Sequence, residues 1–145
     1  MIKLKNFKVQ ELVPEEVYKL WADESVEFMD EAFLLDVDQF VSDIKKDLKV
    51  RSVTVNDWLW GGKFHLSGYR YPTTAVGATN SMHKKGKALD LKFSGANVLD
   101  CYNYLLSNQS RYRTIRRIES IDCTPTWLHV DSKPTNKDGI HVFIP

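Results

Sequence analysis

The sequence predicts an α+β fold in which a mainly antiparallel sheet carries helices packed on one of its sides. Two observations lead to this class. Apolar residues recur at steps of three and four mostly in the first third of the chain, whereas alternating and β-branched segments dominate the remainder. The 145 residues suffice for one core, and no linker or repeat divides them, so we expect a single domain over residues 1–145.

Three helices are expected. Pro14 followed by two glutamates indicates a short helix over 15–21, because proline suits the first turn and acids suit the positive end of the helix dipole. The stretch 36–49 places its apolar side chains on one stripe, with acids early and lysines late. Asn97 is a suitable N-cap for a third helix that runs to about Ser107.

Several further segments alternate or are rich in β-branched residues, which favours strands. These segments cover residues 50–62, 86–93, 114–121, 126–131 and 140–144. The first should end at the Gly61-Gly62 turn, and the period of the third is ambiguous.

Composition restricts the function. A net charge of +1 gives little general attraction for nucleic acid or an anionic membrane, and we expect the arginines of 111–117 to form a solvated face. No apolar run approaches the ~20 residues needed to cross a bilayer, and we see no secretion signal at the N-terminus. Cys101 and Cys123 could pair, but without an export signal we expect two small, partly buried thiols in a reducing compartment.

Polar side chains on two of the predicted strands form a candidate metal site. Alternation puts Asp90 on the polar face of its strand, and puts His129 and Asp131 together on the polar face of another. An unpaired charge under a sheet is costly, so we expect a cation beside Asp90. His83 lies just before the strand and supplies a third donor. Two imidazoles and one carboxylate, with a fourth position for water, are the arrangement of catalytic zinc.

Taken one at a time, these residues have ordinary explanations. A lone histidine is usually a surface or hydrogen-bonded side chain, and we expect this of His65 and His141. Asp90 or Asp131 alone would be an exposed acid on a strand. Only the combination with His83 and His129 favours a metal site.

The chain resembles a known family over two stretches. The segments SGYRYPTTAVGATNSMHKKGKALDL (67–91) and TWLHVD (126–131) look like the zinc D-Ala-D-Ala peptidase family. That family includes D-alanyl-D-alanine carboxypeptidases and phage L-alanyl-D-glutamate endopeptidases, and the signalling domain of Hedgehog shares its fold. The family pattern S-x-H-x-x-G-x-A-x-D is matched at every defined position from Ser81 to Asp90, and the later strand histidine is His129.

The resemblance implies a Hedgehog-like fold and a zinc ion held by His83, Asp90 and His129. It also makes Arg70 the expected stabiliser of the tetrahedral oxyanion, because arginine stays charged and offers a rigid fork of donors. Ser81 either hydrogen-bonds the substrate or steadies the loop that carries His83.

The general base is not fixed by the pattern. Many members of the family carry an acid three residues before the last zinc histidine, where this chain has Thr126. Asp131 is the candidate, because it emerges on the same face of the strand as His129. Asp131 could instead orient an imidazole through its free N–H. Glu119 and Asp122 are reserve candidates for the base.

The resemblance implies a zinc peptidase that hydrolyses an amide bond in peptidoglycan stem peptides or cross-links, as a phage endolysin or virion-associated cell-wall hydrolase. Without a signal peptide we expect cytoplasmic accumulation with release to the cell wall, or a place in the virion. The expected partner is the peptidoglycan peptide, without nucleic acid or membrane insertion, and the expected state is a monomer. The alternative is an inactive family member with a structural or wall-binding role, which Thr126 would suggest. D-Ala-D-Ala, L-Ala-D-Glu and cross-bridge bonds all remain open as the bond that is cut.

Overall fold

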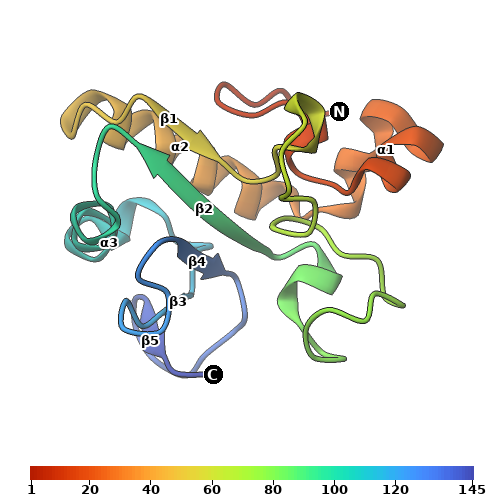
Figure 1. The fold of residues 1–145 in the computed structure, drawn as a ribbon. Helices are drawn as coiled ribbons and strands as arrows, with labels where there is room; N and C mark the ends of the chain where they lie inside the picture. The colour runs from red at the N-terminus through yellow and green to blue at the C-terminus, as the bar shows by residue number, and fades with distance from the viewer.

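A mixed sheet lies at the centre of the computed structural model, which describes residues 1–145 (Figure 1). Its five strands run in the order β1-β2-β4-β3-β5. They are β1 (Ser52–Thr54), β2 (Ala88–Ser94), β3 (Arg117–Glu119), β4 (Leu128–Asp131) and β5 (His141–Phe143). The pairs β1–β2, β2–β4 and β3–β4 are antiparallel, whereas β5 pairs with β3 in parallel. The sheet is therefore mainly antiparallel, as predicted, with one parallel pair at its edge.

The three α-helices begin at identifiable residues. They are α1 (Glu15–Trp21), α2 (Glu31–Asp47) and α3 (Val98–Ser107). Helix α2 starts five residues before the predicted 36–49, because the Asp30 side chain accepts a hydrogen bond from Phe33 N at 2.9 Å and caps an extra turn. Helix α3 starts as predicted, since Asn97 Oδ1 accepts from Asp100 N at 2.8 Å.

The predicted strand over 50–62 is wrong beyond Thr54. The Asp57 carbonyl accepts from Trp60 N at 3.0 Å, which closes the 3-10 helix η3 (Trp58–Trp60). The turn ends at Gly61, whose φ of 84° is open to glycine. The β-branched texture of the segment indicated a strand, but these local hydrogen bonds form a turn instead.

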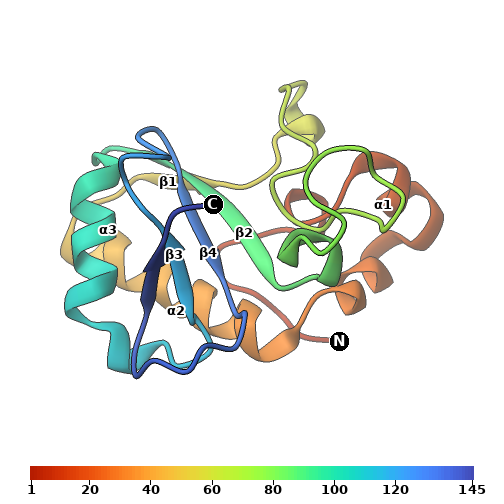
Figure 2. The ribbon, with the colours of Figure 1, turned by 90° about the horizontal axis from the view of Figure 1, so that it is seen from below.

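One face of the sheet is buried against the two longer helices. Leu89 and Leu91 of β2 and Leu128 and Val130 of β4 belong to the core cluster, as the alternation predicted. Figure 2 shows α2 passing behind the strands, and its buried side chains join the same cluster. The opposite face of β2 and β4 is left to polar side chains, and the candidate site lies there.

Both cysteines are free thiols. Cys101 on α3 is buried, whereas Cys123 is exposed rather than partly buried. None of the helices is both long and apolar enough to span a lipid bilayer.

Candidate metal centre

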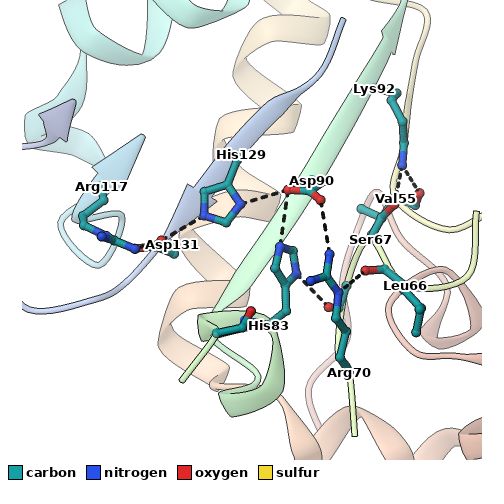
Figure 3. A network of polar contacts seen from close by, with 12 residues as sticks. Val55, Leu66, Ser67, Arg70, His83, Asp90, Lys92, Arg117, His129 and Asp131 are labelled. Atoms are coloured by element: carbon teal, nitrogen blue, oxygen red, sulfur yellow. Dashed lines mark hydrogen bonds and ion pairs between the residues drawn. The ribbon is translucent and has the colours of Figure 1, made fainter. Parts of the chain in front are cut away.

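Three donor side chains converge on the polar face of the sheet (Figure 3). Asp90 on β2 lies opposite His129 on β4 in the antiparallel register, and His129 Nδ1 is 2.9 Å from Asp90 Oδ1. His83 reaches the same oxygen from the 3-10 helix η4 (Met82–Lys85), with Nε2 at 3.4 Å. One donor atom from each of the three residues lies within 4.8 Å of the other two. The structure therefore brings together all three predicted ligands.

The turn that carries His83 is held at both ends. Ser81 is the N-cap of η4, and its Oγ accepts a hydrogen bond from His83 N at 3.3 Å. This contact matches one of the two roles expected for Ser81, that of steadying the loop that carries His83. Gly86 ends η4 with a φ of 68°, and a Cβ there would lie 2.0 Å from the Phe28 carbonyl oxygen. Only glycine fits this entry into β2.

A backbone carbonyl fixes the orientation of the His83 ring. His83 Nδ1 lies 2.9 Å from Gly68 O. A carbonyl can only accept, so Nδ1 carries the hydrogen in this bond and a neutral ring presents the lone pair of Nε2 toward Asp90. Two acceptors that face each other at 3.4 Å need a proton or a cation between them. This contact could not be predicted from the sequence, because the acceptor is a main-chain atom.

The other imidazole is held by a buried carboxylate. His129 Nε2 lies 2.9 Å from Asp131 Oδ2, and Asp131 is fully buried. Arg117 donates to both Asp131 oxygens, from Nε at 2.9 Å and from Nη2 at 2.7 Å. Figure 3 shows Asp131 on the far side of the His129 ring from Asp90. These contacts favour the second role expected for Asp131, that of orienting an imidazole, over the role of general base.

The expectation of a solvated arginine face is wrong for Arg117. Its side chain is 18% exposed and forms an ion pair with Asp131. Its Cζ atom lies 3.9 Å from the centroid of the Phe143 ring. Arg117 and Glu119 share one face of β3, so strand alternation was the signal that could have found this arginine. Arg111 and Arg113, by contrast, are exposed as expected.

The donors strongly affect one another's protonation. Burial alone raises the pKa of Asp90. Its hydrogen bond to His129, together with the one that a proton on His83 Nε2 provides, outweighs burial and holds that pKa far below the usual range. Burial alone lowers the pKa of His129, but the hydrogen bonds to Asp131 and Asp90 raise it to about 9. In the metal-free protein at neutral pH, His129 is thus a cation between two carboxylates.

Arg70 lies beside the three donors, where the resemblance predicted a catalytic arginine. Its Nη2 is 3.8 Å from Asp90 Oδ2, and its Nε donates to Leu66 O at 2.7 Å. Burial lowers the pKa of Arg70 and the charge of Asp90 opposes this shift, so the guanidinium stays charged. Gly77 packs against it, since a Cβ at Gly77 would lie 2.7 Å from Arg70 Nη1.

The donors open into a pocket of about 490 Å³ that also contains Arg70, Ser81 and Glu119. Glu119 is half-buried, and burial raises its pKa, as does the charge of Asp90, although His129 opposes the shift. Asp122 is exposed and is not part of the pocket wall. Of the two reserve candidates for the base, only Glu119 lines the pocket of the candidate metal centre.

Comparison of the chain with family models, with curated proteins and with solved structures finds no match. Support for a function therefore comes from the residues of this chain and their geometry.

Proposed function

We propose that this chain is a zinc-dependent peptidase that hydrolyses an amide bond in peptidoglycan stem peptides or cross-links, as a phage endolysin or virion-associated cell-wall hydrolase. The convergence of His83, Asp90 and His129 at the base of an open pocket is the observation that carries the proposal. The peptidoglycan substrate, the Hedgehog-like fold and the phage setting follow from the motif resemblance in residues 67–91 and 126–131.

The donor set fits zinc. Two imidazole nitrogens and one carboxylate oxygen make a small, borderline-soft set, which suits zinc among the common metals. Both histidines have an outer partner on the ring nitrogen that faces away from the cluster: Gly68 O for His83 and Asp131 for His129. Such partners are typical of metal-binding histidines. A bound zinc ion would lower the pKa of the attacking water to near ~7 and polarise the scissile carbonyl.

The chain's own residues would bind the substrate and move the proton. The Arg70 guanidinium, whose Nη2 lies 3.8 Å from Asp90 Oδ2, would donate to the oxygen on which negative charge develops during attack. Glu119 would accept the proton of the attacking water, because it faces the pocket and its raised pKa suits a group that takes up and returns a proton. Ser81 lines the same pocket, so a hydrogen bond to the substrate is compatible with its capping role.

The alternative function is a catalytically inactive structural or cell-wall-binding protein. It is favoured by Thr126, which is exposed and stands where many members of the resembled family carry an acid. As a peptidase, the protein would act as a monomer. It would accumulate in the cytoplasm and be released to the wall, or be carried in the virion.

A digestion of purified peptidoglycan sacculi separates the two functions. We expect protein loaded with one zinc per chain to release new free amino groups, and we expect a chelator to stop this release and added zinc to restore it. Mass spectrometry of the products identifies the bond that is cut. A zinc-loaded protein that sediments with sacculi but releases no amines would refute the enzyme and support the binding function.

A further inference from the structure

A second pocket adjoins the metal centre along β2. Its volume is about 420 Å³, and its wall comprises Phe64, Ser67, Asp90, Lys92, Thr126 and Trp127. Asp90 and Trp127 also line the pocket of the candidate metal centre, so the two pockets adjoin at these side chains. The second pocket is therefore within reach of a substrate bound at the three donors.

Lys92 is a cation in this pocket without an anionic partner. Its half-buried ammonium donates to Ser67 Oγ at 2.7 Å and to the Val55 carbonyl, both of which are uncharged (Figure 3). It forms no ion pair with any carboxylate of the chain. Burying a charge without a counter-charge is costly, which points to a counter-ion that arrives from outside.

Neither of the two acids whose charges act on Lys92 fills this role. Asp57 accepts from Phe64 N at 2.8 Å and forms no ion pair with the lysine. Asp90 shares the face of β2 with Lys92, but its oxygens contact His83, His129 and Arg70 instead. Two of the three ammonium hydrogens of Lys92 are used by Ser67 and Val55, so one donor is left for a ligand. The rings of Phe64 and Trp127 form the walls beside it. Lys92 Nζ lies 3.9 Å from the centroid of the Phe64 ring.

We propose that this pocket is a carboxylate subsite, in which Lys92 binds the α-carboxylate of the residue that follows the scissile amide. The inference rests on the proposed peptidase function and names the substrate class of the same site. The α-carboxylate carbon of that residue lies three bonds from the scissile carbonyl carbon, ~3.8 Å away when extended. The side chain of Lys92 can cover the rest of the ~6.6 Å that separates residues two apart on a strand. The Thr126 and Ser67 hydroxyls at the pocket wall can donate to the second carboxylate oxygen.

Two kinds of peptide carry this group. In a peptide that ends in D-Ala-D-Ala, it is the C-terminal carboxylate. In a stem peptide that is linked through the side chain of D-Glu, it is the free α-carboxylate of that D-Glu. The same subsite serves either bond, and substrates of both kinds distinguish the two sources.

The test uses two pairs of synthetic peptides and the zinc-loaded protein. One pair ends in D-Ala-D-Ala as the free acid or as the amide, and the other carries L-Ala-γ-D-Glu-L-Lys or its D-isoglutamine counterpart. We expect the wild type to prefer the acid over the amide in one pair, by about 10- to 100-fold in kcat/KM. Lys92→Met should bring this preference close to one. Lys87→Met, which removes a half-buried lysine outside both pockets, should retain it.

Binding is measured in parallel by calorimetry with the same peptides, so the subsite is tested even without turnover. Tighter binding of an acid than of its amide that depends on Lys92, with no cleavage of any peptide or of sacculi, would support the subsite and refute the peptidase. Cleavage of acid and amide at equal rates, or an equal loss of both in Lys92→Met, would refute the subsite and leave the peptidase standing.

Discussion

Asp90 and His129 occupy paired positions on the antiparallel strands β2 and β4, and their side chains touch at 2.9 Å. Two of the three donors are therefore fixed by the hydrogen-bonded ladder of the sheet. The third, His83, comes from a turn whose ends are held by Ser81 and Gly86. A site built on strands is more precisely positioned than one built on loops, which suits a metal centre that requires defined ligand geometry.

Replacing His83 removes one of the three donors. We expect His83→Ala to lower zinc affinity by more than about 100-fold, because the loss of an outer partner alone typically costs 10- to 100-fold. Zinc content after dialysis, measured by elemental analysis, should fall well below one per chain, and activity should fall with it. His65→Ala, at an exposed histidine outside the site, should keep its zinc. Stoichiometric zinc in His83→Ala would contradict the ligand assignment.

Replacing Asp131 tests its role as the partner of an imidazole. Asp131→Asn leaves Arg117 without its buried carboxylate, so we expect the free energy of unfolding to fall by about 3–5 kcal/mol. Zinc affinity should fall by about 10- to 100-fold. Urea titration and competition with a zinc chelator measure the two effects. If both quantities were unchanged and turnover alone were lost, the role of general base would return to Asp131.

Replacing Glu119 tests the proposed base. Glu119→Gln keeps the size of the side chain but cannot accept a proton, so kcat should fall by about 10²- to 10⁴-fold while the zinc content stays at one per chain. Asp122→Asn, at an exposed acid outside the pocket, should keep full turnover. Wild-type turnover in Glu119→Gln would exclude this residue as the base.

The metal-free protein should lose stability at alkaline pH. The pKa of His129 is raised from 6.5 to about 9 in the folded state, so the proton on this ring stabilises the fold. This contribution is fully present below pH 6.5 and is lost as the pH rises through 9; it is on the order of 3 kcal/mol. Urea unfolding of chelator-treated protein from pH 5 to 10 measures the loss.

Two controls identify His129 as the source of this pH dependence. His129→Gln should remove most of the decline between pH 6.5 and 9. Zinc-loaded protein should not show it either, because the metal takes the place of the proton. A decline that is the same in the variant and in the wild type would assign the effect to other groups.

Gly61 and Gly86 both have a positive φ, but an added Cβ would collide with another atom only at Gly86. Alanine substitutions at the two positions therefore separate the cost of backbone strain from the cost of a steric collision. At Gly61 a Cβ would meet nothing within 4 Å, so only the positive φ disfavours alanine there. We expect Gly61→Ala to lower the free energy of unfolding by about 1–2 kcal/mol. At Gly86 the Cβ would also collide with the Phe28 carbonyl, so Gly86→Ala should cost at least about 3 kcal/mol. Unfolding free energies from urea titration compare the two. Equal costs would show that the main chain at Phe28 yields easily.

The sequence predicted the fold best where the signals were local. The periodic stripe of α2 and the Asn97 cap of α3 were recognised because helices depend on neighbours within one turn. The strand predicted over 50–62 failed beyond Thr54 because Asp57 closes a turn through its own backbone and side chain. The parallel pairing of β5 with β3 has no local signature, so it could not be predicted.

The three donor residues of the candidate site could be predicted from the sequence, but the residues that hold the donors in place could not. His83, Asp90 and His129 were found from residue type and alternation, and the structure brings them together. The contact of Arg117 with Asp131 depends on the register of β3 against β4, which the sequence does not specify. Strand register is a tertiary property, and so are the partners that it creates.

The strand order also has a consequence for how the protein is made. Strand β4 lies between β2 and β3 but is synthesised after both. Until β4 emerges from the ribosome, β2 and β3 each expose an edge with unpaired backbone N–H and C=O groups and a face of apolar side chains. Both features promote intermolecular association. Because His129, the last of the three candidate metal donors, belongs to that late strand, a nascent or truncated chain that lacks it would be prone to association and would lack a complete donor set.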